Sequence, residues 1–492
     1  MQNLQLKFIV NPTTIRLFRT LNLLERTHTV TKGRLSTYNN VTERTTLSDM
    51  NKLKGYFEDS VNIMSTNYGY SFELKNHLLF LEQKAQLLEN EVLFEMLGNI
   101  FFGELEELDD LLDRFQLSRS SFRRYLKNIE PVFHEYGVEL ILSPIDLIGN
   151  EANIRKFFKD FYYESEMTPH TVVPPKELHV LIRETFYAQF SKFSVGTGTS
   201  PAEFYYNLYI AIERVQQGRY VTLPQELVDR VKTSKDFHLF SQICPPIERH
   251  YHVSLSEVEC CWLFLVTVTK RPLNRITQEK IFCEQLQLPD FLVPLTDKYL
   301  LECLPGVLAS EGYWVLQSFH YSWYINHLIT PVQNKIMPEV IEQTQQENEA
   351  LYRKNHAFLS AMLPILAITE TCLEDIAASL TLLVSRLVEQ YSDKRKKIVF
   401  LLEGDLYICQ RIRARVVQYF GARHDLIFMT VQVLTDDFFG QEEIDLVVTN
   451  YSDYLSEYPV ATEYLLLKTI PDKQDWHRLF KKIEPELAEL VN

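Results

Sequence analysis

Apolar residues recur at helical spacing along the first part of this chain. The stretch "TTIRLFRTLNLLER" at 13–26 predicts an amphipathic helix, and the shorter segment "TKGRLSTY" follows it. Thr42 then begins "TERTTLSDMNKLKGYFED", a third helix whose Leu47, Met50 and Phe57 we expect to face inward. Three helices with a tight turn before the last are the layout of a helix-turn-helix.

The segments after this third helix have the pattern of strands. "VNIMSTNYGYSFEL" and "HLLFLE" predict strands around a glycine-bearing turn, which would form a wing. A similar order of elements then recurs as apolar helices at 90–102 and 104–115, a turn at 116–117, Ser118 as the N-cap of a further helix, and the strand pair "VELILSPIDLIGNE". Residues 1–165 therefore predict two winged helix-turn-helix units in tandem, related by the order of their elements and not by their residues.

Helical patterns dominate residues 166–390. Ser200 and Pro201 predict the start of one helix, "SLSEVECCWLFLVTVT" predicts a central apolar helix, and Thr330-Pro331 predicts a long helix reaching about residue 360. After the charged linker "YSDKRKK", the buried-type strands "KIVFLL", "LIFMTVQVL" and "IDLVVTN" alternate with the helical "LYICQRIRARVVQYF". This alternation predicts a separate α/β domain with a parallel sheet.

Charge is spread unevenly over the 492 residues. The net charge is -15, yet residues 1–60 contain nine Lys and Arg against five acids, an excess of +4 that leaves -19 for the rest. An acidic chain of this kind does not coat nucleic acid over its whole surface, although a local basic patch remains compatible with it.

The segment "LSRSSFRRYLKNI" at 117–129 is such a patch. On a helix, Phe122, Leu126 and Ile129 share one side and the cations occupy the other, whereas a solvated face usually interleaves both signs. Nucleic-acid phosphates complement such a face, and arginine also reads guanine in the major groove. The predicted DNA-contacting residues are Arg119, Ser120, Arg123, Arg124 and Lys127 in the second unit, and Arg44, Thr45, Ser48 and Lys52 in the less basic first unit.

The sequence lacks the usual signatures of enzymes and metal sites. It has no P-loop, no GxSxG and no Rossmann fingerprint, and we therefore expect no catalytic activity, no cofactor and no metal. His250 and His252 in "RHYH" could bind a metal, but a loop or core role fits better because no Cys or Asp lies nearby. Seven cysteines without a CxxC pair predict a reduced chain without disulfides. With neither a signal peptide nor a membrane span in its pattern, we expect a cytoplasmic protein without a membrane partner.

The segment "DLIGNEANIRKFFKDFYYE" at 146–164 resembles a joint known from Mga/AtxA-type transcriptional regulators of Gram-positive bacteria. In that family it connects the second helix-turn-helix to the regulatory domains, and its G-x-E-x-x-I-R core is present here as Gly149, Glu151, Ile154 and Arg155. The basic helix upstream resembles the family's recognition helix, with Phe122 where Leu or Ile is common. The order of domains also matches: two DNA-binding units, two helical phosphotransferase-regulation domains, and a domain like the EIIB component of sugar phosphotransferase systems.

This resemblance implies a transcriptional regulator, in the first place an activator, that binds double-stranded DNA as a homodimer. It also implies control by histidine phosphorylation from the phosphocarrier protein of the sugar phosphotransferase system. In the first regulation domain the phosphorylated positions map to Asn207, with Arg214 kept, and to Phe264, and neither can be phosphorylated on nitrogen. The remaining candidates are His327 in "INHLITPVQNK" and, more loosely, His179, His250 and His356.

The C-terminal domain departs from the EIIB pattern. An EIIB component holds its phosphate on a Cys in the loop after the first strand, but here this loop is "LLEGDL", where Glu403 and Asp405 would repel a phosphate. Cys409 lies too far along, inside the predicted helix. We therefore expect no phosphotransfer there, and a dimerisation surface in its place.

The fold class that follows is multidomain and mainly α. We expect winged helix-turn-helix units at 1–82 and 83–165, helical regulation domains at 166–285 and 286–392, and an EIIB-like α/β parallel-sheet domain at 393–492. Two other functions stay open. An RNA-binding antiterminator shares the regulation domains but begins with a small all-β module, which the helix-rich N-terminus disfavours. A protein-only phosphosensor scaffold would not bind duplex DNA in a salt-dependent way.

Overall fold

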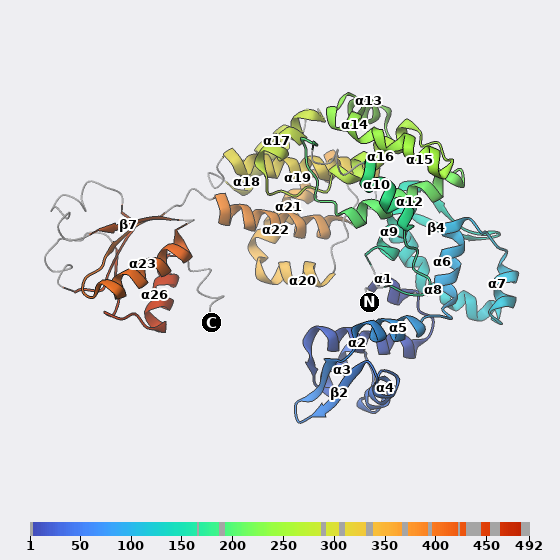
Figure 1. Cartoon of the computed structure of the whole chain (residues 1–492), viewed down its shortest axis with the longest axis horizontal. Coiled ribbons are helices and arrows are strands. Elements are labelled where there is room, and N and C mark those ends of the chain that lie inside the picture. The colour runs from blue at the N-terminus through green and yellow to red at the C-terminus, as the bar shows by residue number, and fades with distance from the viewer. Residues whose placement is uncertain are drawn as a thin grey trace. The chain divides into compact units, whose positions relative to one another are not determined.

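Figure 1 shows the computed structural model of the chain. The structure describes residues 3–164, 167–185, 192–286, 292–304, 310–330, 338–366, 372–391, 396–421, 424–429, 444–452 and 463–483. The chain divides into two compact units, one made of residues 1–303 and 313–382 and the other of residues 304–312 and 383–492. The first is mainly helical with two small antiparallel sheets, and the second holds a four-stranded parallel sheet.

The N-terminal helices surround a small sheet. The helices are α2 (Pro12–Thr27), α3 (Lys32–Tyr38) and α4 (Glu43–Tyr56), and the strands are β1 (Thr29–Val30), β2 (Val61–Thr66) and β3 (Gly69–Leu74). Asn11, Thr31 and Thr42 cap the three helices by accepting backbone N–H groups with their side chains, and the sequence pattern predicts the start at Thr42. The strands pair antiparallel in the order β1-β3-β2.

Two expectations for this region are wrong. The segment "HLLFLE" is not a strand but part of helix α5 (His77–Gln86), which Asn76 caps and in which Phe80 is buried while Leu78 and Leu81 are exposed. Leu47 does not face inward and is 45% exposed. The buried stripe of α4 runs through Thr46, Met50 and Leu53, one residue out of phase with Leu47.

The predicted second set of helices and strands is present. Helices α6 (Val92–Phe102), α7 (Leu108–Arg114) and α8 (Arg119–Glu135) precede the antiparallel hairpin of β4 (Val138–Leu142) and β5 (Ile145–Gly149). The turn between α7 and α8 contains Gln116 at φ +52°, a left-handed conformation that ends α7. Ser118 caps α8, with its hydroxyl accepting the backbone N–H of Ser121 at 3.1 Å.

Helix α1 (Asn3–Lys7) and the residue that follows it pack against this second set. Helix α1 leads to Phe8, whose ring lies 5.7 Å from Phe133 of α8 and 5.1 Å from Phe161 of α9 (Glu151–Tyr162). Gln5 donates to the carbonyl of Phe161 at 3.3 Å. Residues predicted to belong to a domain at 1–82 therefore contribute to an aromatic core built around α8 and α9.

The remainder of the first unit is helical. Its first group is α10 (Lys176–Thr185), α12 (Pro201–Gln216), α13 (Gln225–Thr233), α14 (Lys235–Phe240), η1 (Ser241–Ile243), α15 (Cys244–Tyr251), α16 (Glu257–Val268) and α17 (Ile276–Gln285). The apolar α16 is buried along most of its length, as expected for a central helix. Next come α18 (Leu292–Cys303), α19 (Ser310–Ile329), α20 (Pro338–Glu347), α21 (Glu349–Leu366) and α22 (Leu373–Tyr391). The boundary between the units falls within α19 and α22, so residues 310–312 and 383–391 are counted in the second unit. The predicted start of a long helix at Thr330-Pro331 borders residues 331–337, which lie outside the described ones. Among the described residues that follow, α20 and α21 are separate helices.

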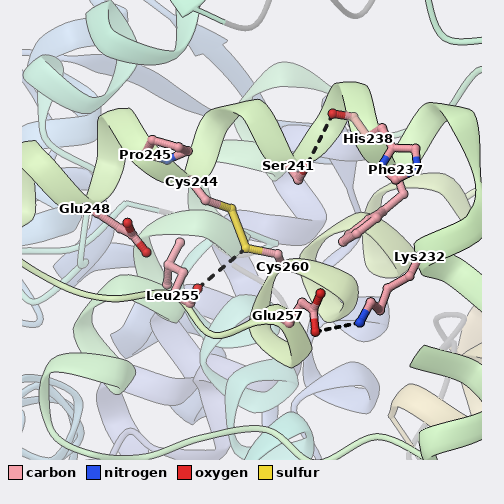
Figure 2. Close-up of a pocket in the computed structure, with 10 residues that line it drawn as sticks. All are labelled: Lys232, Phe237, His238, Ser241, Cys244, Pro245, Glu248, Leu255, Glu257 and Cys260. Carbon is pink, nitrogen blue, oxygen red and sulfur yellow. Dashed lines mark hydrogen bonds and ion pairs between the residues drawn. A yellow bond between two sulfur atoms is a disulfide. The ribbon is translucent and has the colours of Figure 1, made fainter. Parts of the chain in front are cut away.

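The cysteines differ from the expectation of a fully reduced chain. Cys244 at the start of α15 and Cys260 in α16 form a disulfide, and both residues are buried. Figure 2 shows this bond at the edge of a pocket of about 340 Å³. The sequence could not reveal the pair because its members lie 16 residues apart and only the packing of α15 on α16 brings them together. Among the described residues, the other five cysteines form no disulfide bond.

The second unit is an α/β domain. Strands β6 (Lys397–Leu401), β7 (Asp425–Met429), β8 (Leu446–Thr449) and β9 (Tyr464–Leu466) pair in parallel in the order β7-β6-β8-β9. Helices α23 (Leu406–Phe420) and α26 (Lys473–Ile483) pack on the sheet through Ile412, Phe420 and Leu479. The predicted parallel sheet is confirmed.

Candidate nucleic-acid interface and its regulatory joint

Helix α8 separates apolar and basic side chains onto different faces. Phe122, Leu126 and Ile129 are buried, as predicted, and anchor the helix in the core. Arg123, Arg124 and Lys127 are exposed. Within the described residues, none of these three cations forms an ion pair with a carboxylate, although Arg124 lies over the ring of Tyr125 at 5.7 Å. The face therefore presents cationic charge that the protein itself leaves uncompensated.

Arg119 and Ser120 are placed differently. Arg119 is exposed, but its guanidinium donates to both carboxylate oxygens of Asp109 at 2.5 and 2.6 Å. Ser120 forms a hydrogen bond with the capping hydroxyl of Ser118 at 2.9 Å. Both residues stand at the solvent-facing N-terminus of α8, where the positive end of the helix dipole favours an anion. Of the two, Arg119 would have to give up its pairing with Asp109 to meet a phosphate.

Helix α4 provides the corresponding face in the first set of helices. Arg44, Ser48 and Lys52 are exposed, and Thr45 is half-buried beside the capping hydroxyl of Thr42 at 3.0 Å. The exposed Leu47 lies on the same side of the helix. This face is therefore less basic than that of α8 and includes an apolar side chain.

The two hairpins extend the exposed surface beyond the helices. The β2–β3 turn exposes Tyr68 by 82%, and Lys54 of α4 donates to Ser65 of β2 at 2.9 Å. The second hairpin, β4–β5, is tied to α7 because Ser143 donates to the carboxylate of Glu107 at 2.8 Å. Each hairpin is thus fixed to a neighbouring helix by a hydrogen bond.

A buried ion network lies where α9 meets α12 and α16, and we call it the joint: Glu151, Arg155, Arg214 and Glu259. Arg155 donates to both oxygens of Glu259 at 2.6 and 3.1 Å and to Glu151 at 3.0 Å. Arg214 donates to the two oxygens of Glu151 at 2.9 and 2.8 Å. All four side chains are at most 9% exposed. Their charges are therefore stabilised by one another and not by water.

The joint is continued by two further contacts. Asp146, buried in β5, forms an ion pair with Arg219, whose carbonyl accepts from Arg155 at 3.1 Å. Gln217 donates to the carbonyl of Phe101 in α6 at 2.8 Å. The hairpin that follows α8 is therefore connected, through polar contacts, to the helical region that follows α9.

The sequence identified only part of this network. Gly149, Glu151 and Arg155 belong to the motif that resembles the family joint, and Arg214 was aligned with a regulatory motif. Glu259, Asp146 and Arg219 were missed. An acid inside the apolar run "EVECCWLFLV" was the available signal for Glu259, since a carboxylate on a buried helix needs a cationic partner.

The four candidate histidines lie apart on separate helices. His179 of α10 stacks on Tyr205, with 4.0 Å between ring centroids, and burial lowers its pKa. His250 of α15 is exposed beside Tyr251, and His356 of α21 is half-buried near Tyr352. His327 in the last turn of α19 is half-buried, and burial lowers the pKa of its imidazole. The described residues contain no group of three side chains suited to hold a metal ion.

His320 of α19 escaped the sequence reasoning. It is buried, its Nδ1 shares a hydrogen bond with the hydroxyl of Thr296 at 2.9 Å, and burial lowers its pKa to about 4. Its Nε2 has no hydrogen-bond partner among the described residues. No spacing in the sequence distinguishes it, because polar and apolar residues are mixed around α19.

The two positions that lack a phosphorylatable histidine lie on helices α12 and α16. Asn207 and Phe264 are both buried in the helical region. In the second unit, Asp405 caps α23 through the backbone N–H groups of Tyr407 and Ile408 at 2.9 and 3.1 Å. Cys409 sits inside α23, and burial raises the pKa of its thiol, so it is a poor nucleophile.

Two family models match the chain. A Mga helix-turn-helix domain matches residues 76–162, and a PRD domain matches residues 197–267. Neither describes an enzyme. The first match contains α8, β4, β5 and α9, and the second contains α12 and α16, so the joint connects the two matched regions. None of the described helices has the length and apolar character needed to cross a lipid bilayer.

Two relatives with known names are similar to the chain. A protein of Streptococcus pneumoniae serotype 4, "Putative trans-acting regulator", is 26% identical over 46% of this chain and 46% of its own length. "Capsule synthesis positive regulator AcpB" of Bacillus anthracis is 20% identical over 82% of this chain and 83% of its own length. The chain thus spans less than half of the first relative and most of the second. With a Mga helix-turn-helix domain followed by a PRD domain, it belongs with the Mga/AtxA-type regulators.

Proposed function

We propose that this protein is a DNA-binding transcriptional activator whose activity is tuned by the sugar phosphotransferase system. The observation that carries the proposal is the face of α8, where Arg123, Arg124 and Lys127 are exposed and unneutralised above an apolar anchor. Double-stranded DNA is the natural complement, because each phosphate neutralised by a cation releases condensed counterions. A positive regulator among the similar proteins supports activation over repression.

Both helix-turn-helix units would contact DNA in this account, α8 more strongly than α4. Arg119, Ser120, Arg123, Arg124 and Lys127 form the stronger set, and Arg44, Thr45, Ser48 and Lys52 form the weaker one. Cations dominate both faces and amide side chains are few, so we expect phosphate contacts and DNA shape to contribute more than base contacts. The hairpins β2–β3 and β4–β5 would serve as wings.

Control by the phosphotransferase system would act on the helical region. A phosphoryl group from the phosphocarrier protein would add charge at His327, His179, His250 or His356 and shift the packing of neighbouring helices. His327 is favoured because it lies in "INHLITPVQNK", the stretch that resembles the histidine motif of the second regulation domain. The joint offers a route by which such a shift reaches α9 and the hairpin after α8.

The C-terminal domain would have a structural role. Its parallel sheet with flanking helices is compatible with an EIIB-like fold, but the loop after β6 contains Glu403 and Asp405 where a phosphocysteine would be required. We therefore propose that it mediates homodimerisation, which would place two copies of α8 on one DNA site. The five domain boundaries given above belong to this proposal, as does a cytoplasmic location.

A gel-shift series on the full-length chain tests the proposal. Arg123→Ala/Arg124→Ala should weaken binding to duplex DNA by at least tenfold, and Arg44→Ala should weaken it less. A matched control, Lys280→Ala/Lys298→Ala, removes two exposed cations that pair with acids on α17 and α18 and should change little. If neither helix variant weakens binding to duplex DNA, the assignment of α8 and α4 as DNA-contacting helices is wrong. Binding to single-stranded RNA that is tighter than binding to duplex DNA would favour the antiterminator.

A further inference from the structure

A cleft lies directly beside the joint. It has a volume of about 400 Å³ and is lined by residues of α9, α12, α16, α19 and α22 and of the segment 269–273 after α16, all within the first unit. This volume is within the range of small-molecule sites. Arg155, the central residue of the joint, is part of its wall.

The wall of the cleft contains more cations than acids. Five cationic residues line it against two acidic ones, Glu164 and Glu203. Three of the five, Arg155, Lys156 and Arg271, pair with carboxylates that are not part of the wall. The remaining two, Lys159 and Lys270, pair with the two acids of the wall itself, and Lys159 contacts Glu164 at 3.0 Å.

Lys159 and Lys270 share one carboxylate. Glu203 accepts from Lys159 at 2.8 Å and from Lys270 at 2.5 Å. Burial alone would raise the pKa of Glu203, but the two ammonium groups outweigh it and lower that pKa. Lys270 is 53% exposed, and if its ammonium turns towards a second anion, the buried Glu203 keeps its ion pair with Lys159.

Neutral donors and aromatic surface complete the wall. Asn207 and Asn326 contribute amides, and Ser322, Thr330 and Ser379 contribute hydroxyls. Trp262 also lines the cleft; it is 3% exposed, and its indole N–H has no hydrogen-bond partner among the described residues. A buried donor of this kind costs free energy unless a ligand or water accepts from it.

We propose that this cleft binds a small phosphate monoester that also bears hydroxyl groups. The phosphate would be held by Lys270 and Lys159, and the hydroxyl groups by the amides and hydroxyls of the wall. Because Arg155 links Glu151 to Glu259, a ligand in contact with it would alter the joint and so act as an effector. The effect on DNA rests on the proposed function, whereas the binding itself does not.

Calorimetric titration of the full-length chain without DNA tests the binding. The probes are glucose 6-phosphate, fructose 6-phosphate and fructose 1,6-bisphosphate, with inorganic phosphate and glucose as comparisons. We expect saturable binding of at least one ester, at least tenfold tighter than that of inorganic phosphate or glucose. Lys270→Ala and Asn326→Ala should each weaken it by at least fivefold.

The control variant is Lys232→Ala, which removes a half-exposed lysine paired with Glu257 at the other pocket and should bind the ester like the wild type. The proposal is overturned if no ester binds saturably, if inorganic phosphate binds as tightly as every ester, or if Lys270→Ala binds as tightly as the wild type. These titrations contain no DNA, so their outcome does not depend on whether the protein binds DNA. The proposal of ester binding and the proposal of DNA binding can therefore fail independently.

Discussion

Arg155 and Glu259 form a buried, two-point ion pair, with guanidinium nitrogens 2.6 and 3.1 Å from the carboxylate oxygens. Arg155 lies in the region that matches the Mga helix-turn-helix domain, and Glu259 lies in the region that matches the PRD domain. The pair is therefore a direct physical connection between a DNA-binding type of domain and a regulatory one.

Removing one member of this pair should destabilise the protein strongly. Arg155→Met leaves Glu259 and Glu151 buried without their shared cation, which costs about 3–5 kcal/mol in comparable buried pairs. Differential scanning calorimetry should show a large fall in the unfolding midpoint. Arg353→Met, which removes an exposed pair with Glu349, should cost at most about 1 kcal/mol. Equally small decreases in the unfolding midpoint of both variants would show that the buried pair contributes no more stability than the exposed one.

Glu91 should make stability depend on pH. It accepts the backbone N–H of Val10 at 2.9 Å, and burial raises its pKa from 4.5 to about 7. A carboxyl with a raised pKa in the folded state destabilises the fold as pH rises from about 4.5 to about 7, by up to about 3 kcal/mol. Glu91→Gln keeps a neutral acceptor and should gain stability over the wild type between pH 5 and pH 8. A stability difference between Glu91→Gln and the wild type that stays constant from pH 5 to pH 8 would refute the raised pKa of Glu91.

The disulfide should be detectable by counting thiols. In denaturant without reductant, five of the seven cysteines should react with a thiol reagent, and all seven should react after reduction. Cys244→Ser/Cys260→Ser should lose about 3 kcal/mol of stability, as expected for a closed loop of this length. Cys409→Ser serves as the control and should change stability little. Seven reactive thiols before reduction would contradict the bond.

Phosphorylation should occur on one of the four candidate histidines. Incubation of the full-length chain with phosphoenolpyruvate, enzyme I and the phosphocarrier protein should label the protein with acid-labile phosphate. His327→Ala should remove most of the label, whereas His320→Gln should not, because His320 is fully buried in α19. Label that survives substitution of His327, His179, His250 and His356 together would rule out all four.

The helices of the N-terminal third could be predicted from the sequence because their caps and apolar spacing act locally. Ser118 and Thr42 mark helix starts by the chemistry of their own side chains, and the structure places both as caps. The segment "HLLFLE" was misassigned because a short apolar run fits a strand or a helix equally well until Asn76 is seen to cap it.

The joint and the disulfide could not be predicted in full because they depend on tertiary contacts. Arg155 and Glu259 are 104 residues apart, and nothing in either local sequence specifies the other. The faces of α8 illustrate the opposite case. Helical periodicity alone separates Phe122 from Arg123, and the structure confirms their opposite environments.

The salt dependence of DNA binding tests the central claim most directly. Binding of the full-length chain to a duplex of arbitrary sequence, followed by fluorescence anisotropy, should weaken linearly with the logarithm of salt concentration. Arg123→Ala/Arg124→Ala/Lys127→Ala should reduce this slope by about 2 to 3, since each lost phosphate contact removes about 0.9. Lys280→Ala/Lys298→Ala/Arg353→Ala should leave it unchanged. No binding at low salt, or an unchanged slope in the α8 variant, would contradict the account.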